Sequence, residues 1–291
     1  MDRRVVVTGV GLVTPLGIGV ADTWSGLCAG KSGIGEITRF DCSEHITKIA
    51  GEVKGFKAID FMAKKDAKRT EHFIAYAVAA ARMALEDSGY KIDDDNASRI
   101  GVLTGCGLGG LAMLELTART VENKGPKRCS PFFIPMIIGN MAPGIVSMQL
   151  GAKGPNKSVA TACAAGTHAV GDAAMLIKQG YADAMITGGV ESVVTPTCIA
   201  GFNAMKALST RNDAPEKASR PFDRGRDGFV VGEGSGIIIL ESLESARERG
   251  AKIYAELVGY GMSGDAYHMT SPPPDGEGAV NCMRAAIDDA G

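Results

Sequence analysis

Residues 157–179, KSVATACAAGTHAVGDAAMLIKQ, contain the pattern that decides the fold. A short apolar run, Lys157 to Ala162, leads directly into Cys163, and a stretch rich in alanine and glycine follows from about Ala164 to Gln179. Between Lys157 and Asp172 no residue carries a formal charge when histidine is neutral. The pattern predicts a strand followed by a helix that is buried on most sides, with the cysteine at the junction.

The same alternation of strand and helix extends along the chain in both directions. We expect strands at residues 4–8, 100–104, 157–162, 184–187, 236–240 and 253–261, and helices at residues 22–28, 70–88, 111–122, 136–150, 164–179, 243–249 and 278–290. Strands that alternate with helices favour a mainly parallel sheet with helices on both faces.

Composition excludes several classes of protein. The net charge of -2 argues against general nucleic-acid binding. The seven cysteines include no CxxC pair, so we expect neither a disulfide framework nor a metal site. The N-terminus has no signal-peptide pattern, and the uncharged run at 129–152 is interrupted by prolines and glycines, so we expect a cytoplasmic protein with no membrane span and a buried loop and core helix in that run.

Cys163 is the candidate nucleophile. Free N–H groups and the positive end of the dipole at a helix N-terminus favour a thiolate over a thiol, and the same N–H groups can stabilise an oxyanion. Cysteine is also among the most frequently buried residues, so spacing alone leaves an inert core cysteine about equally plausible.

Motifs along the whole chain resemble the β-ketoacyl-acyl-carrier-protein synthases of the elongating type II, in the thiolase-like superfamily. The nucleophile motif of that family is similar to TACAAGTHAVG around Cys163. Further similar motifs are VVVTGVGLVTPLG at 5–17, GCGLGG at 105–110, SPFFIP at 130–135, ALSTRND at 207–213, SRPFDRGRDGFVVGEGSG at 219–236 and SGDAYHMTSPP at 263–273.

The resemblance implies an α/β thiolase fold of five layers, αβαβα, built from two similar halves. The first half would comprise residues 1–250, and residues 251–291 would begin a second half that is incomplete in this chain. The family's active-site histidines, lysine and phenylalanine loop lie beyond residue 291, so we expect residues 1–291 alone to lack full condensation activity.

The resemblance also implies a reaction in two stages. Cys163 takes an acyl chain from acyl carrier protein as a thioester. Malonyl-acyl carrier protein then loses carbon dioxide, and its enolate attacks that thioester to give a β-ketoacyl chain two carbons longer. No cofactor is needed beyond the phosphopantetheine that carries the substrates.

Residues of an acyl pocket follow from the same resemblance, although plain core packing is about as plausible for each of them singly. Gly107, Leu108, Cys198 and Phe202 would line it, Phe133 and Ile134 would close it from the partner of a homodimer, and Thr270 and Ser271 would bind the phosphopantetheine arm. Lys64, Lys65, Lys68, Arg69, Lys127, Arg128 and Lys206 form basic clusters that suit acidic acyl carrier protein, with a solvated surface as the plainer interpretation.

Four other functions compete. GCGLGG at 105–110 matches the GxGxxG pattern of dinucleotide-binding proteins, but no acidic residue clearly follows at the required distance, which disfavours an oxidoreductase. The motifs at 219–236 disfavour a thiolase that uses coenzyme A. A chain-length partner subunit commonly lacks the cysteine that this chain has. A non-catalytic truncated fragment is the remaining alternative.

Overall fold

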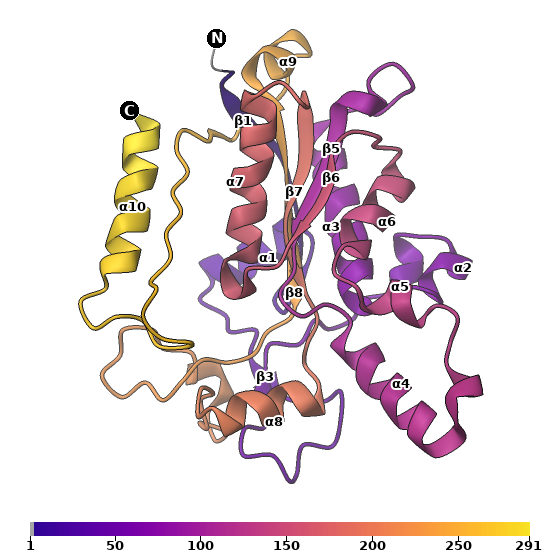
Figure 1. Cartoon of the computed structure of the whole chain (residues 1–291), viewed down its shortest axis with the longest axis vertical. Coiled ribbons are helices and arrows are strands. Elements are labelled where there is room, and N and C mark those ends of the chain that lie inside the picture. Colours follow the sequence, from indigo (N-terminus) through magenta and orange to yellow (C-terminus); the bar gives the residue numbers. More distant parts are fainter. Residues whose placement is uncertain (1–2) are drawn as a thin grey trace.

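The computed structural model describes residues 3–291, which are built around one mixed sheet (Figure 1). The seven-stranded sheet has the order β2-β1-β8-β7-β5-β6, and β9 also pairs with β1. Its strands are β1 (Val5–Thr14), β2 (Gly17–Ile18), β5 (Ile100–Gly105), β6 (Asn156–Val159), β7 (Ala184–Glu191), β8 (Gly234–Ser242) and β9 (Ala255–Glu256). A separate two-stranded sheet pairs β3 (Gly35–Glu36) with β4 (Ile49–Ala50).

Helices cover both faces of the large sheet, as predicted, and pack an apolar core against each face. The helices are α1 (Val20–Cys28), α2 (Lys64–Ala67), α3 (His72–Ser88), α4 (Leu111–Lys124), α5 (Phe133–Ile137), α6 (Met141–Leu150), α7 (Ala165–Lys178), α8 (Pro196–Ala204), α9 (Leu243–Glu248) and α10 (Glu277–Ala290). On one face, α3 buries Phe73 and Tyr76 completely. On the other face, α7 buries Ala169 and Ile177 against Leu103 and Met185.

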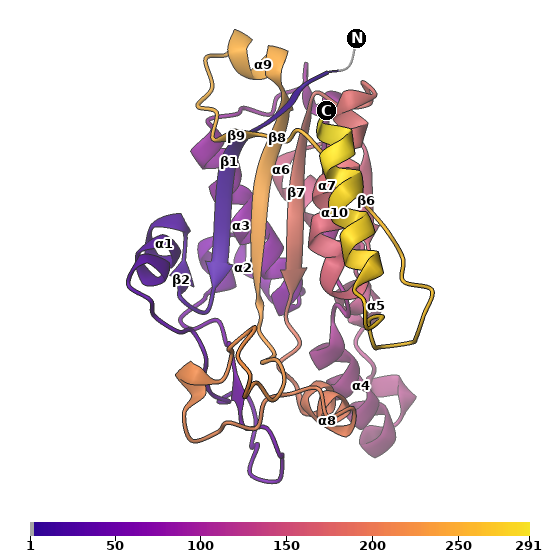
Figure 2. The ribbon, with the colours of Figure 1, turned by 90° about the vertical axis from the view of Figure 1, so that its left-hand side faces the viewer.

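The direction of β8 corrects the prediction of a mainly parallel sheet. β5 is parallel to both β6 and β7, but β8 is antiparallel to β1 and to β7. Figure 2 shows β8 between β1 and β7, whose arrows both point the opposite way. β7 and β8 are separated by α8 and long loops rather than by a single crossover helix, so the chain is free to return in the opposite direction.

Two predicted elements are shorter or broken. The helix expected at 136–150 is divided into α5 and α6, because Ile138, next to Gly139, adopts an extended conformation. The strand expected from 253 to 261 is limited to β9, which pairs with β1 in the first sheet instead of opening a second one. α8 was not predicted, although Thr195 caps it and Pro196 occupies its first position.

Two burial predictions are also wrong. α7 is buried along the stripe facing the sheet, but Thr167 and Met175 on its other side are exposed. The loop at 129–132 is exposed or half-buried rather than buried.

The described residues make three layers, with helices on either side of one large sheet, and α10 lies beyond α7 (Figure 1). The five layers that the family resemblance implies belong to a protein with two complete halves, and the second half is incomplete in these residues. Within residues 3–291, no helix is both long and apolar enough to cross a membrane.

Candidate active site

Close backbone packing brings Cys163 to the end of the sheet. A Cβ atom on Gly105, at the end of β5, would lie 2.1 Å from the carbonyl carbon of Ala165. A Cβ atom on Gly166 would lie 3.2 Å from the Cα atom of Gly189, near the end of β7. These glycines therefore let the first turn of α7 rest directly on the strand ends.

Cys163 itself lies on a tight turn and is exposed. Residues 162–164 form a short 3₁₀ turn ahead of α7, and Ala162 has a φ of 50°. A non-glycine residue in this left-handed region stores backbone strain, which is a frequent feature of functional turns. The predicted junction between strand and helix is confirmed, with the cysteine just before the helix and accessible from outside.

A cavity of about 700 Å³ opens beside Cys163. Its lining comes from the ends of β1, β5 and β7 with the loops that follow them, from the start of β8 with the loop before it, from α8, and from the turn at 162–164 with the first residues of α7. Of the residues assigned to an acyl pocket by resemblance, Gly107, Leu108 and Phe202 line this cavity. The rings of Phe202 and Phe229 meet edge to face at 5.2 Å between centroids and form an apolar part of the wall.

The other predicted pocket residues do not line this cavity. Cys198 is buried in a neighbouring apolar cluster that includes the partly buried Phe202. Phe133 and Ile134 begin α5, where Ile134 is 55% exposed. Thr270 and Ser271 lie in an exposed loop, where their backbone N–H groups donate to Nδ1 of His268.

Two further cysteines near the cavity are poor nucleophiles. Burial raises the pKa of Cys106 well above its usual range, and the neighbouring Glu191 carboxylate raises it further. Burial likewise raises the pKa of Cys198 to about 11. Both thiols therefore stay protonated at neutral pH, which leaves Cys163 as the accessible thiol of the cavity.

Two buried or half-buried carboxylates border the same cavity, and sequence reasoning missed both. Glu191 accepts hydrogen bonds from the backbone N–H groups of Gly107, Leu108 and Gly109, at 2.8, 2.9 and 3.0 Å. Glu233 pairs with Arg39 and accepts a hydrogen bond from Ser192 at 2.9 Å. Their sequence signal was weak, because each is a single acid beside a glycine-rich strand.

Glu191 also decides against a dinucleotide site. The N–H groups of a GxGxxG loop bind phosphate in dinucleotide-binding proteins. Here the carboxylate of Glu191 already accepts hydrogen bonds from the N–H groups of Gly107, Leu108 and Gly109. A phosphate would have to displace a fixed negative charge, so the resemblance of 105–110 to a dinucleotide fingerprint is superficial.

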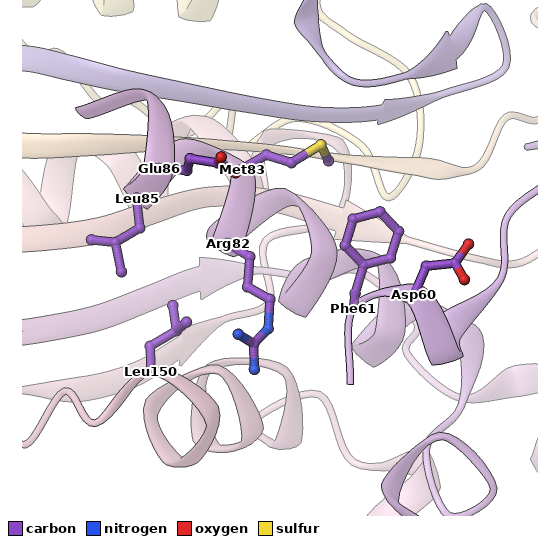
Figure 3. A pocket seen from close by; sticks show the side chains of 7 residues that line it. All are labelled: Asp60, Phe61, Arg82, Met83, Leu85, Glu86 and Leu150. Atoms are coloured by element: carbon purple, nitrogen blue, oxygen red, sulfur yellow. The ribbon is translucent and has the colours of Figure 1, made fainter. Parts of the chain in front are cut away.

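A second hollow, of about 410 Å³, has a different character (Figure 3). It is lined by Asp60, Phe61, Arg82, Met83, Leu85, Glu86 and Leu150. Arg82 extends toward α6, where Nη2 donates to Oε1 of Gln149 at 3.0 Å. This hollow has no thiol or hydroxyl nucleophile in its lining, whereas the cavity beside Cys163 has one.

Comparison with family models decides the relationship. The model described as "Beta-ketoacyl synthase, N-terminal domain" matches residues 2–246, and the corresponding "C-terminal domain" model matches residues 254–291. The chain belongs to the β-ketoacyl synthase family.

Named relatives are similar along nearly the whole of this chain. The chain is 55% identical over 289 residues to "3-oxoacyl-[acyl-carrier-protein] synthase 2" of Synechocystis, covering 99% of this chain and 70% of the relative. It is 54% identical to the protein of the same name from Vibrio cholerae, again covering 70% of the relative. The predicted family, acyltransferase class and role in fatty-acid elongation are confirmed.

Solved ketosynthase structures confirm the fold. A β-ketoacyl synthase from Burkholderia phymatum superposes with a TM-score of 0.89 at 33% identity, over 99% of this chain and 70% of the other. The ishigamide ketosynthase/chain length factor superposes with a TM-score of 0.90 at 36% identity, over 100% of this chain and 70% of the other. The chain therefore has the α/β architecture of the ketosynthases.

Proposed function

We propose that Cys163 is the residue that accepts the acyl chain in this β-ketoacyl synthase. The observation that carries the proposal is its position, on a strained turn ahead of α7 and at the wall of the 700 Å³ cavity. The thiolate would attack the carbonyl carbon of an acyl thioester, forming a new C–S bond. The C–S bond of the donor then breaks, and the donor leaves as its own thiolate.

The cavity suits an aliphatic chain. Most of its lining is apolar or glycine backbone, and Leu108, Val193 and Phe202 supply aliphatic and aromatic side chains. An acyl chain gains about 0.8 kcal/mol for each buried methylene group. We propose that the chain attached to Cys163 lies in this cavity, and that Cys198 shapes its wall through Phe202.

Acyl carrier protein is the proposed donor. Lys64, Lys65, Lys68 and Arg69 on and after α2 are exposed, as are Lys127 and Arg128 before α5. The guanidinium carbon of Arg69 lies 4.4 Å from the ring centroid of Phe132, so the first cluster contacts the loop that follows Arg128. In support, one similar structure is a ketosynthase in complex with a "type II PKS acyl-carrier protein".

Lys206 and the loop at 263–273 extend this proposal. Lys206 is exposed after α8, beside a hollow of about 830 Å³ that shares Phe229 with the cavity of Cys163. We propose that the phosphopantetheine arm lies along the hollow beside Lys206. Thr270 and Ser271 would reach the amide groups of the arm when the loop at 263–273 closes on it.

A homodimer is the proposed assembly. Ile134 is exposed at the start of α5, and the backbone of α5 contacts the loop at 106–110 that lines the cavity. A partner subunit that covered Phe133 and Ile134 would therefore support the acyl cavity from outside.

Intact-mass measurement tests the role of Cys163. After incubation with a palmitoyl thioester, the protein should gain the mass of one acyl group, and peptide mapping should place it at Cys163. Cys163→Ala should lose the adduct, whereas Cys129→Ala, which removes another exposed thiol, should keep it. An adduct that persists in Cys163→Ala would refute the proposal.

A further inference from the structure

The loop between β5 and α4, residues 106–110, is held by a single carboxylate. Oε2 of Glu191 accepts the N–H groups of Gly107 and Leu108, at 2.8 and 2.9 Å, and Oε1 accepts that of Gly109 at 3.0 Å. The thiol of Cys106 approaches Oε1 at 3.4 Å. Four consecutive residues of the loop thus converge on one side chain at the end of β7.

Absence of a side chain at Gly107 makes this contact possible. A Cβ atom there would lie 2.9 Å from Oε2 of Glu191 and 3.7 Å from the Cα atom of Ala162. The backbone of Gly107 therefore lies between the carboxylate and the turn at 162–164. Any movement of the loop at this point would reach the residue beside Cys163.

The far end of the loop rests on α5. The N–H group of Gly110 donates to the carbonyl of Ile137 at 3.2 Å, and a Cβ atom on Gly110 would lie 2.2 Å from the carbonyl oxygen of Met136. Between these two attachments Leu108 is 55% exposed and lines the cavity of Cys163. Its place in the wall is thus set by the backbone attachments and not by packing of its own side chain.

We infer that Glu191 is a positioning residue that fixes the loop at 106–110, and thereby the wall at Leu108, so that the cavity is preformed for long acyl chains. The inference rests on the proposed role of Cys163 and of this cavity. Hydrogen bonds to an ionised carboxylate are about twice as strong as neutral ones, and a preformed site avoids the entropic cost of ordering a loop when the chain binds.

Glu191→Gln tests the inference because it removes the charge and keeps the size. Cys163 of each protein is acylated with palmitoyl and with butanoyl coenzyme A, and the rates are followed by intact mass. We expect the palmitoyl rate to fall about tenfold, as the loss of charge-assisted hydrogen bonds predicts, and the butanoyl rate to fall by less than about threefold. Glu191→Asp should recover part of the palmitoyl rate because it restores the anion.

Controls separate the possible outcomes. Glu244→Gln, on the exposed side of α9, should leave both rates unchanged. Equal loss for both donors with a lower melting temperature, or no loss for either, would overturn the inference. Failure of the unmodified protein to form any adduct at Cys163 would instead refute the proposed function.

Amide hydrogen exchange gives a second test that needs no variant. Gly107 and Leu108 are exposed, so among residues 3–291 the carboxylate of Glu191 alone protects their N–H groups. We expect these two amides to exchange more slowly than unbonded amides of the exposed loop at 263–273. Equally fast exchange in both loops would overturn the inference even if Glu191→Gln fails to fold.

Discussion

At the scale of single residues, Gly105 shows how the position of Cys163 depends on missing side-chain atoms. A methyl group at this position would lie 2.1 Å from the backbone carbon of Ala165. Real contacts of this kind are never so short, so α7 or β5 would have to move. The turn at 162–164, which contains Cys163, precedes α7 and would move with it.

Gly105→Ala should therefore impair both stability and acylation. We expect a loss of about 1–3 kcal/mol in the free energy of unfolding, the range for overpacked sites, and slower acylation of Cys163. Urea unfolding and intact mass give the two measurements. Gly144→Ala is the matched control, because Gly144 lies inside α6 with no atom within 4 Å of the added Cβ; it should be neutral or stabilising by up to about 1 kcal/mol. Equal effects of the two substitutions would contradict the packing argument.

The residues of the site were predictable to different degrees. The position of Cys163 between a strand and a helix could be predicted from its neighbours alone, because an apolar strand that runs into a small-residue helix is a local pattern. Its proposed role as the nucleophile depended on the family resemblance. Leu108 and Phe202 depended on the family resemblance. Glu191 could not be found, because its role arises when β7 ends beside the loop that follows β5, and that contact joins residues more than 80 positions apart.

At the scale of elements, Asp183 joins the beginnings of three strands. It lies immediately before β7, and its carboxylate accepts hydrogen bonds from Arg99, just before β5, at 2.9 and 3.0 Å. Arg3, just before β1, donates to the same carboxylate at 2.7 Å. The hydrogen bonds from Arg99, together with the one from Arg3, lower the pKa of Asp183 to about 2.

The pH dependence of Asp183→Asn follows from this lowered pKa. A carboxyl group whose pKa is lower in the folded protein than in the unfolded chain stabilises the fold at pH values above its pKa in the unfolded chain. For Asp183 this contribution is lost as the pH falls through about 2. We expect Asp183→Asn to lower the free energy of unfolding by about 1–2 kcal/mol at neutral pH, after allowance for partial exposure.

Urea titrations at neutral pH and at several acidic values measure this difference. The difference in the free energy of unfolding between the original protein and Asp183→Asn should become smaller as the pH falls below the pKa that the carboxyl group has in the unfolded chain. Asp94→Asn removes an exposed acid that pairs loosely with Lys153 at 3.5 Å, and should cost less than about 0.5 kcal/mol. A gap that stays constant down to the lowest pH would rule out the linkage.

Elements with strong local patterns were predicted well, and those fixed by distant contacts were not. The helix expected at 70–88 is α3, and Gly89 ends it with a φ of 62° as its position indicated. The division of the helix at 136–150 and the reversed direction of β8 depend on what each segment packs against. Neither periodicity nor propensity carries that information.

At the scale of the whole molecule, the exposed basic residues near α2 and before α5 predict how fast the protein encounters the proposed donor, acyl carrier protein. The net charge is only -2, so the molecule as a whole offers acyl carrier protein no general attraction. The attraction would come from the local basic surface formed by Lys64, Lys65, Lys68, Arg69, Lys127 and Arg128. Such steering changes the rate of encounter more than the affinity, and salt weakens it.

Acylation of Cys163 should therefore depend on salt only when the donor is a carrier protein. Raising the salt from low to physiological concentration should slow transfer from acyl carrier protein by about tenfold, within the range of steered encounters, and leave transfer from a small neutral acyl thioester nearly unchanged. Lys65→Glu combined with Lys68→Glu should lower the carrier-protein rate similarly at low salt. Lys153→Glu reverses a charge on another exposed loop and is the matched control. Equal sensitivity to salt for the two donors would show that these lysines are an ordinary solvated surface.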